Sequence, residues 1–122
     1  MPDPTIPTPT TVAELQAMLR QYPPADSPGA TSAGIFRIRL IPALAEQFLR
    51  FDPDRFRLVQ PWETRKVADM IRRGAWDADV IPPWYLTDTL EMWTGGTRIL
   101  AVLTAGRDID TRVQRVRNHG ER

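Results

Sequence analysis

The sequence predicts one compact α/β (α+β) domain with the element order β-α-α-β-β-α-β, preceded by a mobile arm and one extra helix. Its 122 residues suit a single domain, and 42% of them are apolar, which is enough for one core. Seven of the twelve prolines fall in the first 28 residues, so the chain divides into an arm and a body, which spans residues 35–117. In the body, stretches with a period of two alternate with stretches of helical period, which is typical of mixed α/β domains.

The segment before the body has three expected parts. Residues 1–10 alternate Pro with Thr, which predicts an extended, mobile arm. Thr11 and Glu14 have the spacing of a capping box, and this predicts an accessory helix within residues 11–22. Residues 23–34 are rich in Pro, Gly, Ala and Ser, which is typical of a linker. We expect the helix to dock on the domain or to bind a partner without joining the central core.

The first half of the body alternates apolar residues with Arg over 35–41, the pattern of a strand with one buried face. Pro42 suits a first helical turn, and an apolar stripe after it predicts an amphipathic helix over 42–50. After a loop, a second amphipathic stripe predicts a helix over 61–73, which Gly74 ends.

The second half of the body contains two short apolar runs joined by a polar turn, a broadly apolar helical stretch and a last alternating stretch. In chain order we expect two hairpin strands over Ile81–Thr87 and Leu90–Trp93, a helix over 97–105, a strand from Ile109 to Val113, and a tail over 118–122.

Scarce residue types limit the chemistry. The chain has no Cys, His119 is its only His, and Ser27 and Ser32 are its only serines, which excludes a Ser-His-Asp triad, a Cys-His dyad and the usual zinc sites. We therefore assign no catalytic residue and no metal ligand. The net charge is +1, and no apolar run approaches the roughly 18 residues of a membrane span. The N-terminal residues lack the pattern of a secretory signal, so we expect a cytoplasmic protein without a membrane partner.

The junction between the second hairpin strand and the third helix is the candidate ligand site. Gly95 and Gly96 allow a close approach of the backbone, and the helix start after them offers unpaired N–H groups to an anion. Arg98 places a cation in the first helical turn, where it opposes the helix dipole, and no Asp or Glu occurs over residues 92–107 to offset it. A bound phosphate would explain this arginine. The alternative is a plain tight turn in which Thr97 caps the helix and Arg98 pairs with a distant carboxylate.

Several segments of the body resemble the ParB/sulfiredoxin-like domain, in particular small ParB-like proteins of actinobacterial phages. The stretch Val67–Trp76 is similar to that family's helix ending in "dM..G.W", and Leu90–Leu103 is similar to its "DGQHRL.A" motif at a helix start. Residues 40–49 and 57–61 are similar to the family's first strand, helix and "R.l.p" linker. The resemblance covers residues 35–116 and consists of a matching order of weak motifs.

The resemblance implies that a nucleotide phosphate binds at this loop. The motif's Gly and Arg correspond to Gly95 and Arg98, whereas its Asp, Gln and His are replaced by Thr94, Gly96 and Thr97. Because the ionisable groups are the missing ones, we expect a binding protein more than an enzyme. The implied ligand is CTP, ATP or ADP with Mg²⁺, and the implied role is regulatory or accessory in phage or bacterial DNA transactions, in the cytoplasm of a bacterial host.

Other interpretations of the function remain open. Asp88 and Arg57 are candidate accessory residues of the site, and a phosphotransferase or NTPase would need such a carboxylate near the loop. Arginines could form a basic face for DNA; they are Arg37, Arg39, Arg72, Arg73, Arg112, Arg115 and Arg117. A protein-interaction module that has lost its ligand would engage a host or phage protein through an exposed hairpin patch of Trp84, Tyr85 and Trp93.

Overall fold

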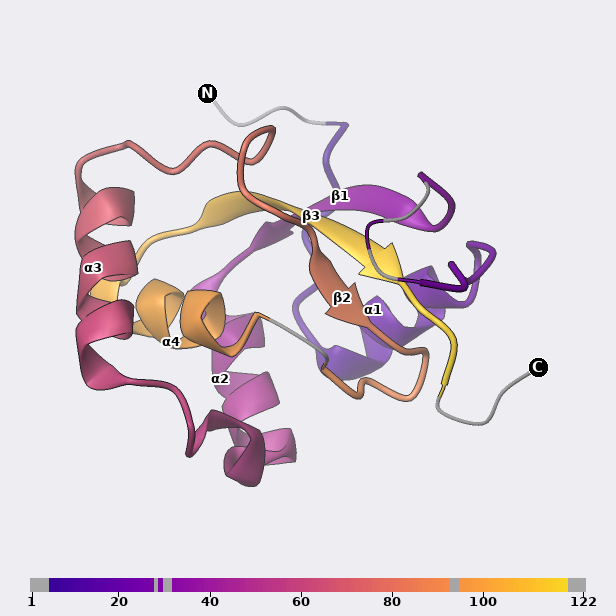
Figure 1. Cartoon of the computed structure of the whole chain (residues 1–122), viewed down its shortest axis with the longest axis horizontal. Helices are drawn as coiled ribbons and strands as arrows, with labels where there is room; N and C mark the ends of the chain where they lie inside the picture. Colours follow the sequence, from indigo (N-terminus) through magenta and orange to yellow (C-terminus); the bar gives the residue numbers. More distant parts are fainter. Residues whose placement is uncertain (1–4, 28, 30–31, 93–94, 119–122) are drawn as a thin grey trace.

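The computed structural model describes residues 5–27, 29, 32–92 and 95–118. Within these residues a three-stranded sheet and four α-helices form a small α/β domain (Figure 1). The strands are β1 (Ile35–Leu40), β2 (Trp84–Leu86) and β3 (Ile109–Arg115). The helices are α1 (Val12–Leu19), α2 (Pro42–Phe51), α3 (Pro61–Arg72) and α4 (Gly96–Ala105), and the short 3₁₀ helix η1 spans Pro53–Phe56.

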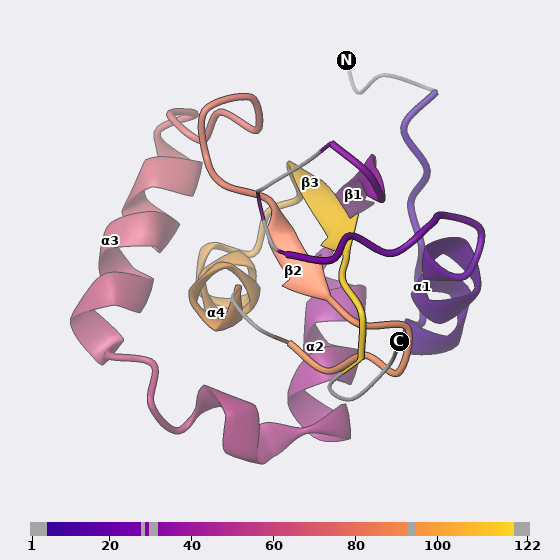
Figure 2. The same cartoon turned by 45° about the vertical axis from the view of Figure 1, so that its right-hand side comes forward.

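The sheet has the order β1-β3-β2, with β3 antiparallel to β1 and parallel to β2. Alternation decides which side chains enter the core: Phe36, Ile38 and Leu40 of β1 are buried, whereas Arg37 and Arg39 face the other side of the sheet. Helices α2 and α4 cover the core face, and α3 packs on α4 (Figure 2). The other face of the sheet therefore carries the charged residues of β1 and β3.

The expected elements of the body outside the hairpin are confirmed within one or two residues at their ends. The strand, both amphipathic helices and the helix after the glycine pair are present, and Gly106 ends α4 in the left-handed conformation with a φ of 65°. The last strand is longer than expected, because it continues to Arg115.

The expected second hairpin strand is wrong for the residues that the structure describes. A turn closes after β2, where Thr87 Oγ1 accepts from the Glu91 N–H at 3.0 Å and Leu90 adopts a φ of 68°. Only an isolated bridge from Leu86 to Met92 follows it, so the sheet has three strands and not four. Local apolar patterning predicted a strand, and the turn does return the chain antiparallel to β2, but the pairing among the described residues is limited to this one bridge.

Helix α1 belongs to the core, contrary to the expectation of a peripheral appendage. Leu15 and Leu19 are fully buried in the main apolar cluster. Half of the expected capping box is confirmed, since Thr11 Oγ1 accepts from the Glu14 N–H at 3.1 Å, whereas the Glu14 carboxylate accepts from the Thr10 N–H instead of the Thr11 N–H. The Gln16 side chain donates to the Asp88 backbone carbonyl at 2.8 Å, which ties α1 to the turn after β2. The amphipathic stripe of a short helix does not reveal how deeply the helix packs, because this depends on distant residues.

The segments on either side of α1 contact the sheet. The Pro7 carbonyl accepts from the Arg39 N–H at the edge of β1, at 2.9 Å. In the expected linker, Ala25 forms a bridge with Val116 beyond the end of β3. No helix among the described residues has the length and apolarity needed to cross a membrane.

Candidate functional site

Helix α4 begins at the glycine pair, as expected, and Gly95 is its N-terminal cap. Gly95 has a φ of 103°, in the left-handed region that favours glycine. A Cβ atom at this position would lie 2.7 Å from Trp84 Nε1, so the close packing of the indole also requires glycine. No side chain caps the helix and no acidic residue occupies its first turn. The N–H groups of this turn therefore form a positive helix end without an internal counter-charge.

Arg98 extends from this first turn into the protein interior. Its side chain is 92% buried, with only 8% of its surface exposed. Arg98 Nη1 donates to Thr111 Oγ1 on β3 at 2.6 Å, and Nη2 donates to the Pro82 carbonyl at 2.7 Å. Its guanidinium carbon lies 5.4 Å from the centre of the Trp76 ring, which is within the range of a cation–π contact. All three partners are formally neutral.

Within the part of the chain that the structure describes, no carboxylate forms an ion pair with Arg98. The alternative prediction, in which Arg98 pairs with a distant acid, is therefore wrong for the described residues. Burial lowers the pKa of Arg98 to about 10; a charge on Tyr85 would oppose this shift, and the neighbouring Arg112 adds to it. At neutral pH the group keeps its proton, so the fold holds a buried positive charge that neutral groups alone solvate.

A small pocket opens beside this charge. It has a volume of about 170 Å³ and is lined by Val67, Trp76, Ile81, Gly95, Thr97 and Arg98. Helix α3 supplies one wall, the segment before β2 a second, and the start of α4 the third. The pocket thus combines apolar walls with the two positive features of the site, the helix end and the guanidinium. We call it the α4 pocket.

Trp84 adds an unpaired donor at the same helix start. Its side chain is fully buried, it contacts Phe48 edge to face at a centroid distance of 4.8 Å, and its Nε1 has no hydrogen-bond partner. The edge of the indole that carries this N–H faces Gly95. The predicted patch for a protein partner required an exposed indole here, so that expectation is wrong for Trp84. Tyr85 is half-buried, and Trp93 lies outside the described residues, as does Thr94 of the predicted loop.

The two predicted accessory residues do not reach the α4 pocket. The Asp88 carboxylate accepts from Asn118 Nδ2 at 2.7 Å and from Arg115 Nη2 at 3.3 Å, at the opposite end of β2 from Pro82. Arg57 is exposed after η1 and pairs with Asp54 at 3.5 Å. Both residues pair with groups near them, and neither lines the pocket.

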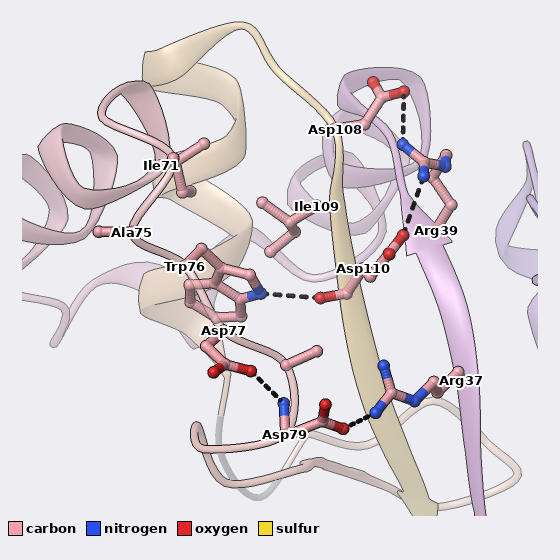
Figure 3. A pocket seen from close by; sticks show the side chains of 12 residues that line it. Arg37, Arg39, Ile71, Ala75, Trp76, Asp77, Asp79, Asp108, Ile109 and Asp110 are labelled. Carbon is pink, nitrogen blue, oxygen red and sulfur yellow. Dashed lines mark hydrogen bonds and ion pairs between the residues drawn. The ribbon is translucent and has the colours of Figure 1, made fainter. Parts of the chain in front are cut away.

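A larger hollow of about 620 Å³ lies on the charged face of the sheet, and Figure 3 shows its side chains. Arg37 pairs with Asp79, and Arg39 pairs with Asp108 at 3.6 Å and Asp110 at 3.0 Å. The Trp76 N–H donates to the Asp110 backbone carbonyl at 2.7 Å (Figure 3). Each arginine of this hollow, which we call the sheet-face hollow, thus already has a carboxylate partner.

Five of the seven arginines of the predicted basic face for DNA also pair with carboxylates, whereas Arg72 and Arg112 donate to backbone carbonyls. All seven of its arginines donate to, or pair with, groups of the domain itself. The partners are Asp79 for Arg37, Asp108 and Asp110 for Arg39, the Thr104 carbonyl for Arg72, Asp69 for Arg73, the Ala78 and Ile81 carbonyls for Arg112, Asp88 and the Tyr22 carbonyl for Arg115, and Asp26 for Arg117. Among the residues that the structure describes, no group of three or more His, Cys, Asp or Glu is placed to hold a metal ion.

Sequence reasoning found Gly95, Gly96, Thr97 and Arg98, but it missed the residues that surround Arg98. One signal was available for Thr111, because it is a polar residue at an inward-facing position between Ile109 and Val113. The Pro82 carbonyl and the ring of Trp76 gave no such signal. Their contacts depend on how the segment before β2 passes over α4.

Comparison with protein-family models, with curated proteins and with solved structures finds no match for this chain. The functional case therefore depends on the geometry of the site and on the weak motifs of the sequence.

Proposed function

We propose that the protein binds a phosphate-bearing ligand in the α4 pocket. The observation that carries this proposal is the buried guanidinium of Arg98, which lines the pocket at the positive end of α4 with no carboxylate among its described partners. Burying a cation costs free energy unless an opposite charge or sufficient hydrogen bonds compensate it. An anion in the pocket would supply the missing charge.

The donors for such an anion are present. The two hydrogen bonds of Arg98 use two of the five N–H donors that a guanidinium carries. The first-turn N–H groups of α4 are donors of the kind that bind phosphate at helix starts. Pro82 and Thr111 hold the guanidinium in one orientation, so binding would require little reorganisation.

The resemblance to ParB-like domains supports the same site and suggests the ligand class. In this resemblance of sequence motifs, Gly95 and Arg98 occupy the positions of the phosphate-binding Gly and Arg, while Thr97 stands in place of a His. The residues that line the pocket include no carboxylate and no histidine that could act as an acid or base. We infer a regulatory or accessory binding protein in DNA transactions, with a nucleotide such as CTP, ATP or ADP as the candidate ligand.

Thermal unfolding with and without phosphate compounds tests the proposal. A ligand at ten times its Kd stabilises the native state by about 1.4 kcal/mol, which raises Tm by a few degrees for a domain of this size. We expect this shift with inorganic phosphate or nucleotides in the wild type and not in Arg98→Met. Arg65→Met is the matched control, because it removes the same charge from an exposed position of α3. Equal shifts in both variants, or none in the wild type, would reject the proposal.

A protein-interaction module is the second candidate, on a different surface from the one predicted. Phe51, Leu58 and Trp62 are each more than half exposed, and they lie close in sequence between the end of α2 and the start of α3. Large exposed apolar side chains of this kind are typical of protein-binding surfaces. A protein whose binding is lost on Leu58→Asp, together with an absence of any anion effect, would favour this function over the first.

A further inference from the structure

We propose that the α4 pocket accepts a single terminal phosphate group, end-on and without a metal ion. The ligand would then be inorganic phosphate or a phosphomonoester, and not a magnesium-bound triphosphate. This inference rests on the proposed function and narrows its ligand class.

The size of the pocket supports one phosphate group. Pockets that enclose a whole drug-sized ligand have volumes of roughly 300–1,000 Å³, whereas the α4 pocket has about 170 Å³. At about 30 Å³ per water molecule, this is the space of five or six waters, which suits one tetrahedral group of five heavy atoms. The sugar and base of a nucleotide would remain outside the pocket.

The charge of the pocket supports the same conclusion. Among the described residues of its lining Arg98 is the only cationic side chain, and Val67 and Ile81 contribute apolar walls. Arg112 is the neighbouring cation, but its N–H groups donate to the carbonyls of Ala78 and Ile81 at 2.8 and 2.9 Å. One guanidinium and one helix end match the charge of a single phosphate. A chain of three phosphates would place further negative charge against apolar walls.

The absence of carboxylate ligands among the described lining residues argues against a bound metal ion. Mg²⁺ in nucleotide sites is held by one or two protein carboxylates in addition to the phosphates. No described carboxylate lines the α4 pocket, and Asp88, the acidic residue predicted for the site, is engaged at the other end of β2. A magnesium ion on the ligand would therefore gain no carboxylate ligand from the described residues of this site.

Calorimetric titration with matched ligands tests the inference. The probes are inorganic phosphate, AMP, CMP, ATP and CTP, each with EDTA and with excess Mg²⁺. We expect the Kd values of phosphate, AMP and CMP to agree within about threefold, and Mg²⁺ to leave the Kd of ATP and CTP unchanged or to weaken it. A tenfold or greater tightening by Mg²⁺, or ATP binding at least tenfold tighter than AMP, would overturn the inference and leave the proposed function standing. Binding of none of the five would reject both.

A pocket-filling variant locates the binding. Val67→Phe occupies the pocket from α3 and keeps Arg98, so we expect a loss of phosphate affinity of at least tenfold. Val80→Phe is the matched control, because Val80 is 75% exposed outside the pocket, and it should bind like the wild type. If Val67→Phe fails to fold, competition decides instead: phosphate must displace AMP at a single shared site, and simultaneous binding of both would overturn the inference. Unchanged binding by a folded Val67→Phe would also overturn it.

Discussion

Trp76 lines both the α4 pocket and the sheet-face hollow, but the arginines of the two cavities have different kinds of partner. In the hollow, Arg37 and Arg39 are partly exposed and pair with carboxylates. In the pocket, Arg98 is 92% buried and has only neutral partners. The arginines of the larger cavity thus already have carboxylate partners, while the arginine of the smaller one has none among the described residues. A ligand site is therefore better indicated by the charge that the protein leaves uncompensated than by the size of a cavity.

Trp76 makes a different kind of contact with each of the two regions. On one side its N–H donates to the Asp110 backbone carbonyl, which holds the ring against β3. On the other side its ring carries the guanidinium of Arg98. The contact with β3 is a structural hydrogen bond, whereas the contact with Arg98 helps to solvate a largely buried charge. Three predictions test this contrast, beyond the experiments proposed above.

The largest expected difference is between two glycines with left-handed backbone, one lining each region. Gly95→Ala should destabilise the fold by about 3 kcal/mol or more, because the backbone strain adds to an overlap of the new Cβ with Trp84. Gly74→Ala, which lines the hollow at a φ of 71° with nothing within 4 Å, should cost only about 1–2 kcal/mol. Urea unfolding of both variants measures the two values. Equal costs would show that the packing of Trp84 on Gly95 is not tight.

An intermediate effect is expected from the pH dependence of stability. Burial lowers the pKa of Arg98 to about 10 in the folded state, below the value of an exposed guanidinium. The unfolded chain therefore binds more protons from pH 10 upward, and stability rises with pH across that window. The wild type should gain about 1 kcal/mol relative to Arg98→Met between pH 10 and 11.

Denaturant unfolding of both proteins at pH 9, 10 and 11 measures this difference. Taking the difference between the two proteins removes the part of the pH dependence that both share. Saturating phosphate should reduce the gain, because a bound anion favours the charged form of Arg98. Parallel pH profiles of the two proteins would contradict the buried, uncompensated state of this charge.

The smallest effect is expected in the sheet-face hollow. Arg37 and Asp79 form an ion pair in which the side chains are 38% and 73% exposed. Exposed pairs of this kind contribute about 0.2–1 kcal/mol, because water and salt screen them. A double-mutant cycle with Arg37→Ala and Asp79→Ala should give a coupling energy in that range, which falls in 0.5 M salt. A coupling above about 2 kcal/mol would mean that the hollow is drier and more strongly organised than its exposure indicates.

The sequence by itself determined the local structure of this protein. The alternation over β1, the apolar stripes of α2 and α3, and the glycines at the ends of α4 are short-range features, and each was confirmed by the structure. They can be read from the chain because hydrophobic period and backbone freedom act over a few residues. The position of the candidate site at a glycine pair before a helix was predicted for the same reason.

Tertiary structure alone decided what surrounds these elements. The partners of Arg98 lie 16 residues before it and 13 residues after it, at Pro82 and Thr111, and the burial of α1 depends on a turn more than 60 residues away. The run after β2 had the composition of a strand, yet among the described residues it pairs with β2 only through the single bridge from Met92 to Leu86. Burial and charge compensation are sums over contacts between distant segments, so a pattern read along the chain can locate an arginine but not the environment that gives it a role.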